Sequence, residues 1–167
     1  EISDLNQLEA NKRNIIQIIH VSDCGNTKYG KLYKSNSKYV LANLQFGIDQ
    51  ALKNKNLALV TGPISKENII SINKAFSGHT EYIQQRTKSD EVLMLLASDQ
   101  LKVALVTTHI PLKKVANKIS KELVIRKVIT LNEGLKEKFK IKNPEIKLLG
   151  LNPHSGEGGK IGKEEID

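Results

Sequence analysis

Short apolar runs that alternate with helical patterns are the feature that most constrains the fold of this chain. Apolar residues recur at helical spacing in 38–54, and a longer stripe of the same kind runs from Leu123 to Phe139, with a helix end expected near Lys142. A further helix is expected from about Ser65. The runs predicted to be strands are 15–19, 57–60, 91–96, 103–107 and 146–149. Since alternating strands and helices favour a sheet covered on both faces, we expect an α/β fold with a mainly parallel sheet, in one region spanning 1–167.

Length and cysteine content limit the class of protein further. A chain of 167 residues is long enough for one domain with a sizeable core. Cys24 is the single cysteine, so an internal disulfide is excluded, which fits a reducing compartment and a cytoplasmic protein. No apolar run approaches the length of a membrane span, and no signal peptide opens the chain. The first residue is Glu1 rather than Met, which favours a fragment or a processed end.

The net charge of +8 raises the question of a nucleic-acid partner. Among the 26 basic residues only Arg13, Arg86 and Arg126 are arginines, and the lysines are scattered along the chain. The four tyrosines and three phenylalanines are not interleaved with a basic patch, as base-stacking modules require. The pattern therefore favours a lysine-rich soluble surface, with neither a nucleic acid nor a membrane as partner.

Three of the four histidines are expected at or just after strand ends, where ligands bind in open α/β sheets. These are His79, His109 and His154, and each stands beside glycine or proline. Imidazoles that share one rim with carboxylates suit a divalent ion such as Zn, Co or Mn. The alternative is that each imidazole only bonds its own loop. For His20, which lacks a comparable loop, this alternative is preferred.

The loop 150–159, GLNPHSGEGG, follows the predicted strand 146–149 and holds four glycines. It is not a dinucleotide fingerprint, because Gly-x-Gly-x-x-Gly would need a glycine where Ile161 stands, and it has no Lys-Ser or Lys-Thr pair of a P-loop. We expect its glycines to allow close approach of backbone to a ligand. A helix start near Lys163 would favour an anion nearby. The alternative is a flexible surface loop.

Four motifs resemble those of the 4-hydroxythreonine-4-phosphate dehydrogenases, the PdxA family. They are TGPISKE at 61–67, SGHTE at 77–81, VTTHIPL at 106–112 and the stretch 150–167, and the resemblance covers about 14–167. It implies a three-layer α/β/α fold similar to isocitrate and isopropylmalate dehydrogenases. It also implies a homodimer with the active site between domains and subunits.

The resemblance further implies the chemistry. The family oxidises the hydroxyl of 4-phosphooxy-L-threonine with NAD, and the resulting β-keto acid loses carbon dioxide to give 3-amino-2-oxopropyl phosphate for pyridoxal phosphate synthesis. A divalent metal (Zn, Mg, Co or Mn) assists as a Lewis acid. By motif match, His109 and His154 correspond to metal ligands, whereas His79 and Thr80 correspond to substrate contacts. No residue is assigned to catalysis or to NAD.

Two departures from the family pattern bear on activity. The family's N-terminal Gly-Asp-Pro segment has no match, and the chain stops before the third metal histidine, the phosphate-binding residues and most of the NAD site. We therefore expect a middle fragment that is inactive alone. Gly62 and Ser65 stand where the family more often has Ala and Asn. A dehydrogenase of 4-phospho-threonate or 4-phospho-erythronate, and a non-catalytic degenerate binding module, remain as alternatives.

Overall fold

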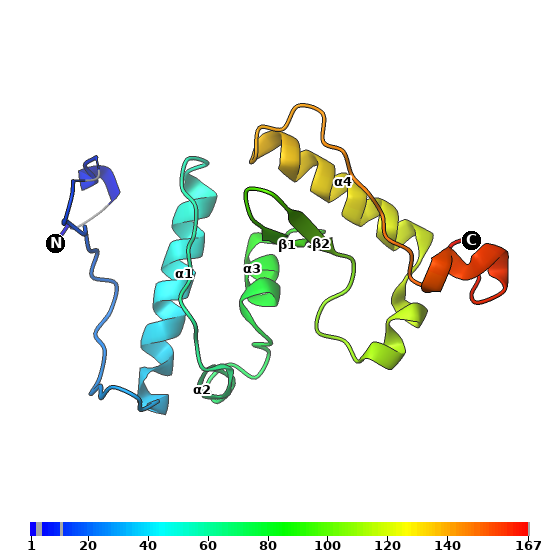
Figure 1. Cartoon of the computed structure of the whole chain (residues 1–167). Coiled ribbons are helices and arrows are strands. Elements are labelled where there is room, and N and C mark those ends of the chain that lie inside the picture. Colours follow the sequence, from blue (N-terminus) through cyan, green and yellow to red (C-terminus); the bar gives the residue numbers. More distant parts are fainter. Residues whose placement is uncertain (3–4, 11, 167) are drawn as a thin grey trace. The chain divides into compact units, whose positions relative to one another are not determined.

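The protein is described by a computed structural model covering residues 1–2, 5–10 and 12–166 (Figure 1). The chain divides into two compact units, Glu1–Lys88 and Ser89–Asp167, which are treated separately below. The single region spanning 1–167 stays a prediction.

The first unit consists of helices and contains a small apolar core. Its helices are η1 (Leu5–Gln7), η2 (Lys34–Asn36), α1 (Ser37–Lys53), α2 (Lys66–Ile70) and α3 (His79–Thr87). The core consists of Leu44, Ile48, Ile69, Phe76 and Tyr82. The helix predicted over 38–54 is confirmed by α1, whose apolar stripe supplies the first two of these residues. The helix expected from Ser65 is confirmed by α2, whose first turn is capped by the Ser65 hydroxyl.

The second unit contains the hairpin of β1 (Met94–Ala97) and β2 (Lys102–Leu105) and the long helix α4 (Lys121–Glu137). The 3-10 turns η3 (Leu112–Lys114) and η4 (Ala116–Lys118) complete it, together with η5 (Pro153–Gly159), whose residues 154–158 have positive φ. The Ser120 hydroxyl accepts a hydrogen bond from the Leu123 N–H at 3.2 Å and so caps the start of α4. The predicted second long helix is therefore present, and it ends at Glu137 rather than near Lys142.

The predicted strands 91–96 and 103–107 are confirmed by β1 and β2, but their pairing differs from the expected parallel sheet. β1 and β2 pair antiparallel, with Met94 opposite Leu105, because the short turn 98–101 joins them and a parallel pair would need a long crossover. Among the described residues, the other pairing is an isolated parallel bridge between Ile2 and Ile19. The segments 57–60 and 146–149 are not assigned to strands. A mixture of helices with a small sheet is thus present, and the mainly parallel sheet is not confirmed.

A charged cluster ties α4 to the start of the hairpin. Lys127 Nζ donates to Glu91 Oε1 and to the Val92 carbonyl oxygen, both at 2.6 Å, and Arg126 Nε donates to Glu91 Oε2 at 3.2 Å. The Lys127 side chain is only 15% exposed, whereas that of Arg126 is 57% exposed. The hydrogen bond from Lys127 is the main cause that lowers the pKa of Glu91. Lys127 is therefore the more important partner of the two.

Lys127→Met should destabilise the protein by about 1–3 kcal/mol, because Glu91 and the Val92 carbonyl lose their shared donor. The matched change Arg126→Met should cost at most about 1 kcal/mol, since this pair is solvent-exposed. Since the pKa of Glu91 is lowered on folding, its contribution is present above the ordinary carboxyl pKa and is lost as pH falls through the lowered value. Urea unfolding at several pH values measures both effects. Equal losses of stability in the two variants would contradict the conclusion that Lys127 is the more important partner of Glu91.

No helix in the described part of the chain combines the length and the apolar character that crossing a bilayer requires.

Candidate functional site

His154 opens a turn of left-handed backbone. The residues with positive φ in this turn are His154 (51°), Ser155 (52°), Gly156 (77°), Glu157 (45°), Gly158 (65°) and Gly159 (90°). Left-handed backbone costs L-residues other than glycine roughly 1–2 kcal/mol each. His109, the other candidate metal ligand, also has a positive φ of 55°. Strained backbone of this kind concentrates at functional sites, so it supports a functional role for both histidines.

Glycines in this region allow parts of the loop to approach one another. A Cβ on Gly156 would lie 2.6 Å from the Gly162 carbonyl oxygen, and a Cβ on Gly162 would overlap the Asn152 side chain. A Cβ on Gly150 would lie 2.7 Å from Ser155 Oγ. The bare backbone expected from the sequence is thus required by the loop's own packing. The helix expected near Lys163 is instead a turn, closed by the Ile166 N–H on the Lys163 carbonyl oxygen.

Asn152 is held by two carboxylates from the end of the motif. Its backbone N–H donates to Glu165 Oε1 at 2.6 Å, and its Nδ2 donates to Glu165 Oε2 at 2.9 Å and to Glu164 Oε2 at 2.7 Å. The hydrogen bond from the Asn152 backbone is the main cause that lowers the pKa of Glu165. We call Asn152, Glu164 and Glu165 the Asn152 clamp. Sequence reasoning missed the clamp, and the only signal for it was that the three residues share one motif.

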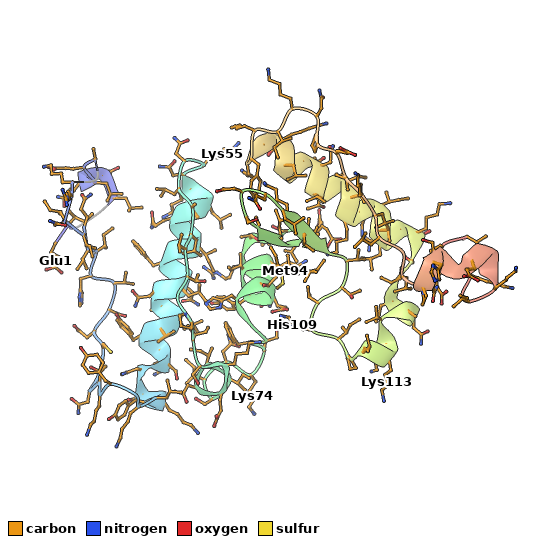
Figure 2. The ribbon with its side chains drawn as sticks, in the orientation of Figure 1. Glu1, Lys55, Lys74, Met94, His109 and Lys113 are labelled. Atoms are coloured by element: carbon orange, nitrogen blue, oxygen red, sulfur yellow. The ribbon has the colours of Figure 1, made fainter. Side chains whose placement is uncertain are left out.

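The two candidate metal ligands belong to the same unit. His109 follows β2 in the loop before η3, where Figure 2 labels it, and His154 begins the left-handed turn. Both are exposed, and within the described residues neither imidazole has a hydrogen bond or ion pair. Available imidazole nitrogens fit the needs of a divalent ion such as zinc. No group of three or more His, Cys, Asp or Glu residues placed to hold a metal ion occurs in the described ranges.

The convergence of His109 and His154 on one ion stays a prediction. His79 and Thr80, the expected substrate contacts, lie in the other unit, at the first two positions of α3. His79 therefore starts a helix and does not follow a strand, contrary to the expectation from the sequence. Helix N-termini carry free N–H groups that favour anions, which is compatible with a substrate role for both residues.

The prediction that His20 only makes a contact within its own loop is confirmed. Its Nε2 lies 3.3 Å from Asp23 Oδ1, three residues along the chain, and both side chains are exposed. This is a local contact within its own loop.

The family model described as "Pyridoxal phosphate biosynthetic protein PdxA" matches residues 1–167. This chain belongs to the PdxA family. The resemblance found in the four motifs is thereby confirmed over the whole chain.

Relatives of the PdxA chain are named 4-hydroxythreonine-4-phosphate dehydrogenase. One from Chromobacterium violaceum is 39% identical over 167 residues, which is 100% of this chain and 51% of the relative. One from Marinobacter nauticus is 43% identical over 152 residues, 91% of this chain and 45% of the relative. A crystal structure of such a dehydrogenase from Burkholderia phymatum has a TM-score of 0.70 and 33% identity, covering 85% of this chain and 43% of that one. The chain spans about half the length of the curated relatives it matches.

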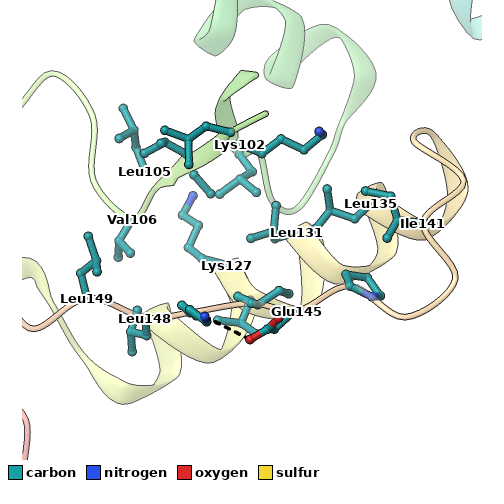
Figure 3. Close-up of a pocket in the computed structure, with 18 of the residues that line it drawn as sticks. Lys102, Leu105, Val106, Lys127, Leu131, Leu135, Ile141, Glu145, Leu148 and Leu149 are labelled. Carbon is teal, nitrogen blue, oxygen red and sulfur yellow. Dashed lines mark ion pairs between the residues drawn. The ribbon is translucent and has the colours of Figure 1, made fainter. Parts of the chain in front are cut away.

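Two cavities lie away from the candidate ligands. The larger, of about 550 Å³, is lined mainly by apolar side chains of β2, α4 and the segment 144–149, including Leu105, Leu131, Leu135 and Leu148 (Figure 3). A second, of about 310 Å³, lies in the first unit and includes Ser65. Neither of these two cavities is lined by a candidate histidine.

Proposed function

We propose that the protein carrying this chain is an NAD-dependent 4-hydroxythreonine-4-phosphate dehydrogenase. It would oxidise and decarboxylate 4-phosphooxy-L-threonine to 3-amino-2-oxopropyl phosphate for pyridoxal phosphate synthesis. The observation that carries the proposal is a relative of this name that is 39% identical over every residue of the chain. The histidine-bearing motifs at 77–81, 106–112 and 150–167 lie within that match.

Each candidate residue has a stated task in this proposal. His109 and His154 supply imidazole nitrogens to a divalent ion (Zn, Mg, Co or Mn), which when bound provides Lewis-acid chemistry at the substrate hydroxyl. His79 and Thr80 contact the substrate, and the N-terminal end of α3 favours its negative charge. The strained backbone at His109 and His154 supports their proposed role as metal ligands, because backbone strain is retained where function needs a fixed geometry.

The remaining expectations belong to the same proposal. They are a three-layer α/β/α architecture with a mainly parallel sheet, a homodimer with the active site between subunits, and a cytoplasmic location. The crystal structure from Burkholderia phymatum supports the architecture at a TM-score of 0.70.

A related substrate, 4-phospho-threonate or 4-phospho-erythronate, is the alternative, because dehydrogenases of these compounds share the four motifs, and the departures at Gly62 and Ser65 loosen the substrate assignment. In the structure the Ser65 hydroxyl accepts a hydrogen bond from the Asn68 N–H at 3.3 Å and so caps α2. Asn is an equally good N-cap, so replacing the family's Asn by Ser preserves this task. The departure at Ser65 is therefore explained without a change of substrate.

An NADH absorbance assay tests the proposal. The protein expressed from its complete reading frame should reduce NAD with 4-phosphooxy-L-threonine and a divalent ion, and removing the ion with a chelator should stop the reaction. Residues 1–167 alone should not reduce NAD. Preference for 4-phospho-erythronate or 4-phospho-threonate would replace the substrate, and absence of turnover with all three would favour a non-catalytic module.

A further inference from the structure

The left-handed turn that carries His154 has a side-chain anchor at its first end, at Asn152. The backbone bonds of this turn include those from the Ser155 N–H to the Asn152 carbonyl oxygen and from the Ile161 N–H to the Gly156 carbonyl oxygen, both at 3.1 Å, and the Lys160 N–H also donates to the Gly156 carbonyl oxygen. Asn152 precedes His154 by two positions and itself makes three hydrogen bonds to Glu164 and Glu165. Hydrogen bonds from Asn152 therefore hold the start of the turn against the carboxylates of Glu164 and Glu165.

Such an anchor is needed because the turn is strained. His154, Ser155 and Glu157 are L-residues with φ between 45° and 52°. Left-handed backbone is unfavourable for each of them, so an unanchored loop would relax toward right-handed or extended backbone. Relaxation at His154 would redirect its imidazole, because the direction of the Cα–Cβ bond follows the backbone.

Glu165 makes the larger contribution to the clamp. It accepts from both the backbone N–H and the side-chain amide of Asn152, whereas Glu164 accepts only from the side chain. The Asn152 amide also packs against the bare Gly162 backbone, where a Cβ would overlap it. The clamp is thus built from the carboxylates, the amide and a glycine that leaves room for it.

We infer that Glu165, acting through Asn152, is the positioning residue that holds His154 in its left-handed turn and so fixes the direction of the imidazole. Among the described residues, no hydrogen bond or ion pair joins Glu165 to the imidazole of His154. The inference rests on the proposed role of His154 as a metal ligand. It adds the residue that fixes the orientation of this ligand in the metal-free protein.

The test uses three variants of the protein expressed from its complete reading frame. Glu165→Ala removes both acceptors. Glu165→Gln keeps a carbonyl oxygen for the Asn152 N–H. Glu157→Gln removes one negative charge from the same loop, at an exposed side chain with no hydrogen bond or ion pair to the described residues, and so controls for charge near the metal. The readouts are hydrogen–deuterium exchange of peptides covering 150–156, measured without metal, and the affinity for Co²⁺ followed by its absorption spectrum.

Glu165→Ala should speed exchange in 150–156 and weaken Co²⁺ binding by on the order of 10–100-fold, the usual effect of losing a group that orients a ligand. Glu165→Gln should recover most of the affinity and the protection, and Glu157→Gln should change neither. Wild-type exchange and wild-type Co²⁺ affinity in Glu165→Ala would overturn the inference.

The same experiment separates the inference from the proposed function. If His154→Ala leaves Co²⁺ affinity unchanged, the ligand role of His154 is wrong. Exchange in 150–156 then still decides the clamp: faster exchange in Glu165→Ala supports the hold on the turn, and unchanged exchange removes it.

Discussion

Gly156→Ala should disrupt the left-handed turn and abolish metal binding through His154. Gly156 is buried with φ of 77°, and a Cβ there would lie 2.6 Å from the Gly162 carbonyl oxygen, so the methyl group adds a backbone clash to the conformational cost. Together these should cost about 3 kcal/mol or more in this loop. Faster amide exchange at Ile161, which donates to the Gly156 carbonyl oxygen, and loss of Co²⁺ affinity would report the change.

Gly158→Ala is the matched control for this effect. Gly158 also has a positive φ, of 65°, but a Cβ there would meet nothing within 4 Å. It should therefore show only the conformational cost of roughly 1–2 kcal/mol. Equal effects of the two substitutions would show that the close contact between Gly156 and Gly162 has no energetic consequence.

His154→Ala should lower metal affinity by on the order of 100-fold or more, since losing a ligand should exceed the 10–100-fold effect of losing a supporting group. Turnover should fall with affinity. Excess metal should restore part of the activity if binding is the main loss. Because the ligand form of imidazole is neutral, metal binding by the unsubstituted protein should also weaken in acid. Calorimetric titration with Zn²⁺ measures the affinity.

His20→Ala provides the control, because His20 pairs locally with Asp23 and should leave metal affinity unchanged. A structure of the complete protein with His109 and His154 on opposite faces of the sheet would refute their shared metal site.

Long periodic patterns predicted the helices well, whereas short apolar runs predicted β1 and β2 but also runs that are not assigned to strands. α1 and α4 follow from residues repeating at helical spacing over many positions, a signal that is local to each helix. The runs 57–60 and 146–149 have the composition of strands, yet Val60 is 91% exposed and Leu149 86% exposed. Strand pairing depends on a neighbour far away in sequence, and a short run carries no information about that neighbour.

The sequence proposed residues for the candidate site but did not predict the geometry of their loop. The glycines of 150–159 indicated unusual backbone, but they gave no sign that His154, Ser155 and Glu157 share the same left-handed conformation. The hydrogen bonds of Asn152 to Glu165 were equally hidden, since acids at the end of a motif are usually solvated. Both features depend on how the loop folds back on itself.

The left-handed backbone of this turn also changes which substitutions it should tolerate. At Ser155 and Glu157, glycine and asparagine become conservative replacements, while valine, isoleucine and threonine become the disruptive ones, because branching at Cβ is hardest to accommodate at positive φ. The left-handed backbone therefore determines which residue types these positions tolerate, independently of charge or hydropathy.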